Sequence, residues 1–97
     1  VKPKGMIYID EGALSALQKK GKSLLPSGVV KIEGKFIKGD VVSIVDVGEK
    51  REVARGLMNY SADEVRKVKG LRTSLIKKTL GYKPYDEIVH RDNIVLL

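Results

Sequence analysis

Apolar and polar positions alternate in short runs along the chain, and most runs end at a glycine, a proline or an aspartate. The first run, Met6–Ile9, is typical of a β-strand and ends at Asp10. Apolar residues then recur at helical spacing as far as Leu17, and Asp10 suits the N-cap of that helix. Gly21 can take the left-handed position after the last helical turn. This pattern predicts a strand followed by a helix.

Three further apolar runs predict strands separated by tight turns. They cover Val29–Glu33, Val41–Asp46 and Glu52–Met58. The middle run is β-branched and mostly apolar, so we expect its strand to be covered on both faces. The third run returns after a turn as the partner of a hairpin. We expect Gly39 and Gly56 to lie at turns or at close approaches of the backbone.

A second helix is indicated by residues at its predicted start. Ser61 and Glu64 have the spacing of a capping box, and Tyr60 and Val65 occupy the positions of a hydrophobic staple. We expect this helix to end at Gly70.

A third helix is predicted to open at Thr73 or Ser74 and to stop at Gly81. Two short strands, Glu87–His90 and Asn93–Leu97, then close the chain around a polar corner. The predicted order is β-α-β-β-β-α-α-β-β. It favours an α+β pseudobarrel with short helices over a doubly wound parallel sheet.

Length and composition limit the protein to one small domain. Val1–Gly5 has no periodicity, and we interpret it as a linker from an N-terminal domain outside this sequence, with residues 6–97 as the domain itself. A chain of 97 residues is too short for a kinase or dehydrogenase core of ordinary size. It has no cysteine and one histidine, which excludes disulfides, thiolate metal sites and multi-imidazole sites. We therefore expect no catalytic, cofactor or metal site here, and no apolar stretch is long enough to cross a membrane.

The chain is basic, with 19 Lys and Arg residues, 12 Asp and Glu residues and a net charge of +7. Residues 1–50 carry +3 and residues 51–97 carry +4, so we expect the excess to be spread along the chain without a basic tail. A positive field of this kind attracts phosphates. A lysine-rich surface that only keeps the protein in solution is the alternative, and charge alone leaves both open.

The sharpest basic cluster is Lys19, Lys20 and Lys22, at the end of the first predicted helix. These lysines could bind phosphates, or they could simply complement the negative end of the helix dipole. His90 could act as a general base, but its position at a corner better suits a hydrogen-bonded structural histidine. For Asp10 and Glu11, an N-cap with a first-turn acid is the ordinary explanation, in place of an acid–base pair.

Several of these turns and strands occur together, in order, in a known family. The segments that carry the likeness are Ile9–Ala13, Gly21–Pro26 with Ser27–Val30, Gly39–Val42, Val53–Gly56, Leu80–Tyr82 and Val89–Asn93. This pattern closely resembles the PUA domain, a small pseudobarrel of RNA-modifying enzymes. The flanking residues resemble in particular the C-terminal PUA domain of the glutamate 5-kinase (γ-glutamyl kinase) family. One departure lies between Gly70 and Leu80, where that family often has acidic residues and this chain has Leu75, Lys77 and Lys78.

The resemblance implies a parent enzyme that uses ATP and Mg²⁺ to phosphorylate the γ-carboxylate of L-glutamate, in the first committed step of proline biosynthesis. Its catalytic residues would lie in an amino-acid-kinase domain of the same chain, so this part would be catalytically silent and without cofactor. A cytoplasmic enzyme that forms a homo-oligomer, without membrane attachment, is implied as well.

The role of the domain itself stays open at this stage. It is either a regulatory or assembly module of the kinase or an RNA-binding module, and the alternative parent is an RNA-modifying enzyme. By resemblance to RNA-binding PUA domains, the candidate RNA-binding residues are Lys19, Lys20, Lys22, Ser23, Gly28 and Arg91.

Overall fold

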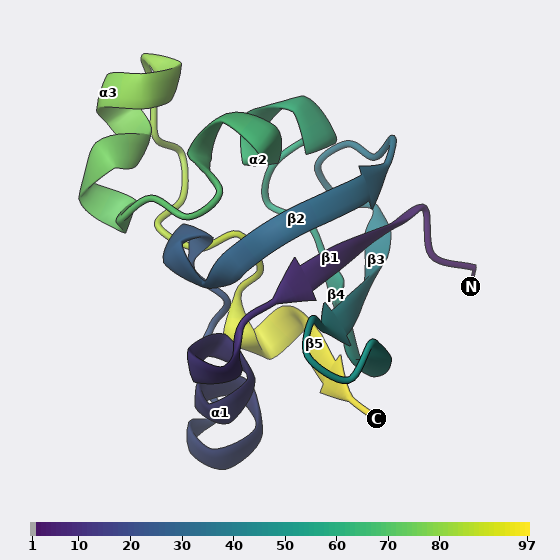
Figure 1. Ribbon diagram of the computed structural model, residues 1–97. Coiled ribbons are helices and arrows are strands. Elements are labelled where there is room, and N and C mark those ends of the chain that lie inside the picture. The colour runs from purple at the N-terminus through teal and green to yellow at the C-terminus, as the bar shows by residue number, and fades with distance from the viewer. Residues whose placement is uncertain (1) are drawn as a thin grey trace.

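The protein is described by a computed structural model over residues 2–97, in which five strands form one sheet flanked by three short helices (Figure 1). The strands are β1 (Gly5–Ile9), β2 (Val29–Gly34), β3 (Val41–Asp46), β4 (Arg51–Leu57) and β5 (Ile94–Leu96). The helices are α1 (Glu11–Lys20), α2 (Ala62–Val68) and α3 (Ile76–Leu80), and 3-10 turns lie at Pro26–Gly28, Thr73–Leu75 and Arg91–Asn93. The predicted linker stays a prediction, since Val1 lies outside the described residues and β1 begins at Gly5.

The sheet has the order β2-β1-β3-β4-β5 and is mixed. β1 pairs in parallel with β3, whereas the other neighbours pair antiparallel. A parallel pair needs a crossover, and here α1 and β2 supply it between β1 and β3. The architecture confirms the predicted α+β class.

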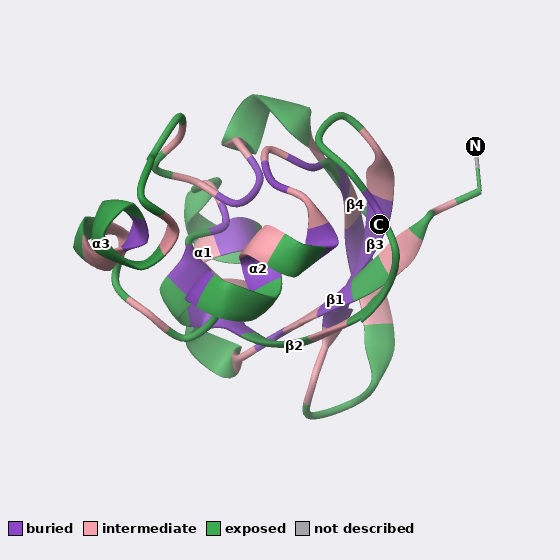
Figure 2. Cartoon of the chain, turned by 90° about the horizontal axis from the view of Figure 1, so that it is seen from above, coloured by how far each residue is buried: buried purple, intermediate pink, exposed green. Residues whose placement is uncertain are grey.

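The core lies between one face of the sheet and the helices (Figure 2). Ile7 and Ile9 of β1 and Val42 and Ile44 of β3 are fully buried there. As the sequence predicted, β3 is covered over most of its length on both faces, because Ser43 and Val45 are also nearly inaccessible. The radius of gyration is 11.9 Å, about the value expected for a single domain of this length.

Both predicted ends of α1 and the predicted start of α2 are confirmed, whereas α2 ends at Val68, before Gly70, and a 3-10 turn at Thr73–Leu75 precedes α3. The Asp10 carboxylate accepts a hydrogen bond from the Ala13 amide at 2.8 Å, and Gly21 ends α1 with a φ of 58°. At α2 the capping box is complete. The Glu64 amide donates to the Ser61 hydroxyl at 3.2 Å, and the Ser61 amide donates to the Glu64 carboxylate at 2.8 Å. Each of these side chains accepts a hydrogen bond from a backbone amide at the start of a helix, where the helix itself offers no acceptor.

The predicted staple is buried, and it also anchors the chain that follows α3. Tyr60 and Val65 are fully buried. The Tyr60 hydroxyl donates to the Tyr85 carbonyl and accepts from the Tyr85 amide, and the two rings meet edge to face at 6.1 Å. Burial away from water is the main cause of the raised pKa of Tyr60.

The predicted strand Glu87–His90 is wrong. In its place the chain forms an isolated bridge between Leu24 and Val89, in which the Leu24 carbonyl accepts from both the Ile88 amide (2.8 Å) and the Val89 amide (3.3 Å). The Ile88 carbonyl accepts from the Asn59 amide. The apolar residues of this segment are apolar because they are buried. Their backbone hydrogen bonds go to two separate segments, so no strand ladder forms.

Two glycines have the structural roles that were predicted for them. Gly56 faces the segment after α3, where a Cβ atom would stand 2.6 Å from Val89 Cγ1 and 3.2 Å from the Asn93 carbonyl oxygen. Gly39 has a φ of 91°, which L-residues rarely adopt. Its amide donates to the Met58 carbonyl at 2.8 Å and so holds the turn before β3.

Candidate nucleic-acid interface

Three of the six predicted RNA-binding residues line one pocket beside α1. Lys22, Ser23 and Gly28 contribute to its wall, and its volume is about 450 Å³. The remaining lining residues come from the first two turns of α1 and from the turn before β2, and they are Asp10, Gly12, Ala13, Ala16, Leu25 and Ser27. The sequence drew attention to the basic end of α1, but it did not reveal that the helix start and the Pro26–Gly28 turn share this pocket with it.

Ser23 joins this pocket to the C-terminal corner of the chain. Its hydroxyl oxygen accepts a hydrogen bond from the Arg91 amide at 2.8 Å, although the two residues are 68 positions apart. The backbone of Arg91 therefore lies beside Ser23, the residue that follows Lys22 in the chain. Lys19 and Lys20 lie in the exposed last turn of α1. Binding of RNA by these residues stays a prediction.

Gly28 has a structural reason to be glycine. It is buried, and a Cβ atom there would stand 2.5 Å from the Cβ of Ala13 on α1. Its carbonyl accepts a hydrogen bond from the Asp10 amide at 3.0 Å. The glycine thus permits α1 to pack against the turn before β2, and the pocket lies along this contact.

The charge around the pocket is mixed. Asp10 lines it, Glu11 follows in the first turn of α1, and Asp92 lies beside Arg91. The Asp10 carboxylate is occupied in capping α1. A phosphate at this surface would therefore meet lysines and carboxylates together.

His90 has the hydrogen-bonded structural role that its position favoured. Its Nδ1 atom accepts a hydrogen bond from the Asp92 amide at 3.1 Å and caps the 3-10 turn Arg91–Asn93. His90 also borders a second pocket of about 370 Å³, where the Lys38 ammonium lies 4.8 Å from the centre of the Tyr85 ring. Among residues 2–97 no group of three His, Cys, Asp or Glu side chains is placed to hold a metal ion.

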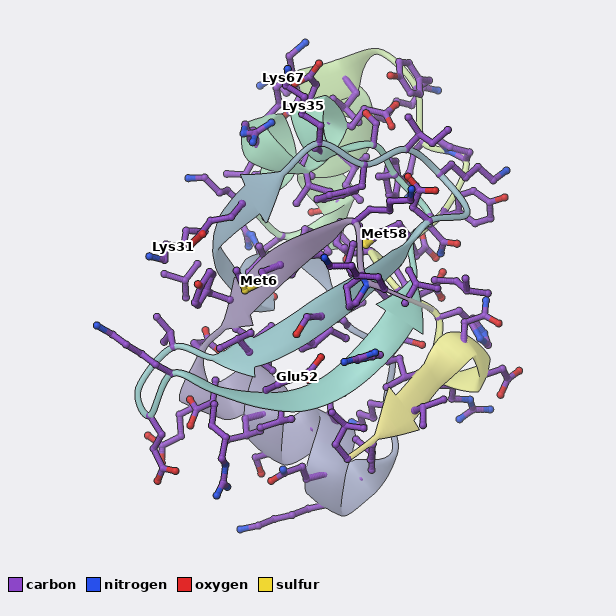
Figure 3. All side chains as sticks on the ribbon, turned by 90° about the vertical axis from the view of Figure 1, so that its right-hand side faces the viewer. Met6, Lys31, Lys35, Glu52, Met58 and Lys67 are labelled. Atoms are coloured by element: carbon purple, nitrogen blue, oxygen red, sulfur yellow. The ribbon has the colours of Figure 1, made fainter. Side chains whose placement is uncertain are left out.

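A second candidate surface is the face of the sheet that points away from the core (Figure 3). Cross-strand pairing places a row of five side chains on it, one from each strand. The row consists of Glu33, Met6, Ser43, Arg55 and Val95. Met6 and Val95 are exposed, and so is Leu57 at the end of β4. The one direct signal for this surface in the sequence is Ser43, a polar residue inside an apolar strand.

A polar cluster lies at the centre of this face. The Ser43 hydroxyl donates to Glu52 Oε2 at 2.6 Å, and Arg55 Nε donates to the same oxygen at 2.8 Å. Arg55 Nη2 also lies 3.4 Å from Glu52 Oε1. The bonds from Arg55 and then from Ser43 lower the pKa of Glu52, because both stabilise the carboxylate. The partly buried charges are thus satisfied within the sheet, and exposed apolar atoms surround them.

Within residues 2–97 no helix is both long and apolar enough to cross a lipid bilayer.

A five-stranded mixed sheet with three short helices is the arrangement of one known class. The sequence model of the PUA domain matches residues 5–80, and the chain belongs to the PUA domain family. A PUA domain from Aeropyrum pernix K1, whose crystal structure is described as a tartrate complex, is similar in fold. The TM-score is 0.62 and the identity 30%, over 78% of this chain and 37% of that one.

The particular relatives are glutamate 5-kinases. The chain is 60% identical over 96 residues to the glutamate 5-kinase of Thermoanaerobacter sp. (strain X514) and 50% identical over 97 residues to that of Saccharophagus degradans. These matches cover 99% and 100% of this chain, and they lie in the C-terminal region of the enzymes. The chain spans about a quarter of the length of these relatives, 26% in both cases.

Proposed function

We propose that this chain is the C-terminal PUA domain of a glutamate 5-kinase. The identity of 50–60% to such kinases over nearly the whole chain carries the proposal. A cytoplasmic parent enzyme would bind ATP and Mg²⁺ in an amino-acid-kinase domain of the same chain and phosphorylate the γ-carboxylate of L-glutamate for proline biosynthesis. The present domain is then non-catalytic. Reading the coding sequence upstream of Val1 tests this parentage, since a pseudouridine-synthase or transglycosylase domain there would overturn it.

The role that the geometry supports best is regulation or assembly through docking on the kinase domain. The outward face of the sheet offers Met6, Tyr8 and Arg55, residue types that are enriched in protein interfaces. The chain also enters the domain beside this face, where the Lys4 amide donates to the Val41 carbonyl at 2.8 Å (Figures 1 and 3). A domain that precedes β1 would therefore emerge next to an apolar surface that it could cover.

The docking role predicts a specific response of the longer enzyme. Met6→Asp with Val95→Asp places two charges on the face and should change the oligomeric state or the dependence of the rate on glutamate. Thr79→Asp, an exposed position on α3, adds a charge away from the face and should change neither. Size-exclusion chromatography with light scattering and a coupled ADP assay measure both properties. Identical behaviour of the wild type and the double variant would exclude this face.

A second role, RNA binding at the pocket beside α1, is favoured by one observation. The hydrogen bond from the Arg91 amide to the Ser23 hydroxyl places the backbone of Arg91 beside Ser23, which lines the same pocket as Lys22, so residues of two distant basic segments come together. If three or four of these cations contact phosphates of one strand, log K should fall with log salt at a slope of about −2 to −3.

Filter binding of wild type beside the Lys19→Ala, Lys20→Ala, Lys22→Ala variant tests the RNA role. A flatter salt slope and weaker binding of every sequence alike would support it, because phosphate contacts do not discriminate between bases. Unaltered binding would mean that these lysines only complement the end of α1.

A further inference from the structure

The net charge of the chain is concentrated in one segment, which the comparison of its two halves does not reveal. Residues 66–83 contain seven Lys and Arg residues and no Asp or Glu. The rest of the chain contains twelve of each sign and is therefore neutral. The expectation that the excess of positive charge is spread along the chain is wrong. A comparison of residues 1–50 with residues 51–97 hides the segment, because the second half also contains six acidic residues. We refer to residues 66–83 as the basic lobe.

The fold turns the basic lobe into one rigid projection. The lobe comprises the last turn of α2, the Thr73–Leu75 turn, α3 and the residues that follow. Val68 and Ile76 are fully buried and anchor it to the core. The Gly70 amide donates to the Pro26 carbonyl at 2.8 Å, and the Tyr82 hydroxyl donates to Glu64 on α2. The backbone that carries the cations is therefore held in place.

Three acidic residues that flank the basic lobe in the sequence have partners. Asp63 pairs with Arg66 at 3.4 Å, and Asp86 pairs with Lys83 at 3.1 Å. Glu64 caps α2 and accepts from Tyr82. Five cations of the lobe are exposed and form no ion pair with any residue that the structure describes. They are Lys67, Lys69, Arg72, Lys77 and Lys78.

α3 and the lysines of the basic lobe lie away from the lysines of α1 and from the entry of the chain, although the Gly70 amide of the lobe bonds to Pro26 in the turn that borders the pocket. α3 and the N-terminal end of the chain are on opposite sides of the molecule in two perpendicular views (Figures 1 and 2). α1, with its own lysines, lies at the opposite end from α2 and α3 (Figures 1 and 3). A partner of the lobe would therefore bind on the side of the molecule away from the entry of the chain.

The chemistry of the basic lobe favours nucleic acid over an acidic protein as that partner. The core of a protein interface is depleted in lysine and rich in apolar and aromatic side chains. In the lobe four of the five exposed unpaired cations are lysines, and Tyr82 is its single exposed large hydrophobic residue within the described part of the chain. Interfaces with nucleic acid are instead strongly positive and polar.

We infer that the basic lobe binds the phosphate backbone of a nucleic acid strand without base preference. The lysine ammonium groups act as point charges that release the counterions of the phosphates. One exposed tyrosine, whose hydroxyl is held by Glu64, provides little surface for base stacking. This inference does not rest on the proposed kinase parentage, because it concerns only side chains of the present chain.

The experiment compares three variants that each lose three positive charges. The lobe variant carries Lys67→Gln, Lys77→Gln and Lys78→Gln. The helix variant carries Lys19→Gln, Lys20→Gln and Lys22→Gln. The scattered variant carries Lys2→Gln, Lys31→Gln and Lys50→Gln. Fluorescence anisotropy with a labelled oligouridylate, and with a mixed-sequence oligonucleotide of equal length, measures binding over a series of salt concentrations.

The lobe variant should bind both strands about tenfold or more weakly at low salt, and its salt slope should be flatter by about 2, or about 0.7 for each lost contact. The scattered variant should bind nearly as the wild type does, and the helix variant should lose less affinity than the lobe variant. Equal weakening in all three variants would assign binding to net charge alone and overturn the inference. Loss in the helix variant only would overturn it too and would favour the pocket beside α1.

Two further measurements keep the inference testable if the lobe variant is poorly folded. Backbone NMR shifts of the wild-type chain, titrated with the oligouridylate, should change mainly at residues 66–83. Changes confined to α1 and the turn before β2 would overturn the inference. Poly-glutamate serves as a competitor of the same charge sign. If it displaces the strand equally well per charge, the lobe recognises acidic polymers in general, and the assignment to nucleic acid is wrong.

Discussion

Glu52 and Arg55 lie three residues apart on β4, yet their side chains meet on the same face of the sheet, with Arg55 Nε 2.8 Å from Glu52 Oε2. Residues three apart on a regular strand point to opposite faces. The pairing shifts between Ile44 and Val45, which pair with Ala54 and Glu52, so β4 carries one extra residue. This β-bulge restores the common face and creates the acceptor for the buried Ser43 hydroxyl on β3.

The first prediction concerns this cluster. Glu52→Ala should lower the free energy of unfolding by about 1–3 kcal/mol, because it leaves the nearly buried Ser43 hydroxyl without its acceptor. Ser43→Ala removes the donor and leaves no buried hydroxyl without a partner, so it should lower the free energy of unfolding by only about 0.5–1.5 kcal/mol. Urea unfolding of both single variants and the double variant measures the coupling between the residues. A double variant whose loss equals the sum of the single losses would show that the hydrogen bond contributes nothing.

The second prediction is a pH dependence of the same group. The folded-state pKa of Glu52 lies below its ordinary value, owing first to Arg55 and then to Ser43. A group of this kind stabilises the fold above its unfolded pKa, about 4.3, and the contribution disappears as the pH falls through the folded pKa. The stability difference between wild type and Glu52→Gln should therefore be constant near neutral pH and shrink in acid. A difference that grows in acid would contradict this sign.

The third prediction separates two kinds of glycine. Gly56→Val should lower the thermal midpoint by several degrees because the new Cβ atom meets Val89 and the Asn93 carbonyl. Gly39→Val has open space around it but a φ of 91°, and about 1–3 kcal/mol of backbone strain should lower its midpoint as well. Gly48→Ala is the control, since its nearest neighbour would be a flexible side-chain oxygen at 3.6 Å. Calorimetry measures the three thermal midpoints. A midpoint of Gly48→Ala as low as those of the other two variants would contradict both the steric and the backbone explanation.

The fourth prediction concerns the start of α2. Ser61→Ala removes one half of the capping box and should lower the free energy of unfolding by about 1 kcal/mol. Glu64→Ala should cost more, because this carboxylate caps the helix and also accepts from Tyr82 at the base of the basic lobe. Chemical denaturation measures both losses. An equal loss for the two variants would mean that the contact with Tyr82 adds no stability.

The fifth prediction is that the 97-residue chain has no glutamate-dependent kinase activity. It contains no phosphate-binding loop and is too short for a kinase core. A coupled assay should show ADP release no higher than that of a heat-treated control. Release that depends on glutamate would overturn the assignment of catalysis to another domain.

The sequence alone was sufficient to predict the local elements of the fold. The N-cap at Asp10, the capping box at Ser61 and the stops at Gly21 and Gly81 depend on the side chain or backbone freedom of one or two residues, so they can be recognised without any tertiary contact. The strands 29–33 and 41–46 follow from β-branched runs between turns in the same way. The concentration of positive charge in the basic lobe is also written in the sequence, but it appears only in a window of the right length.

Tertiary structure decided which distant residues share a surface. The segment 87–90 has the apolar pattern of a strand, but its backbone bonds go to Leu24 and Asn59, so no ladder forms. The bulge in β4 and the Ser23–Arg91 hydrogen bond join residues across strands and across 68 positions, and no spacing along the chain encodes either. Local propensity depends on neighbours in sequence, whereas the pocket, the polar cluster and the rigid lobe depend on packing that only the folded chain provides.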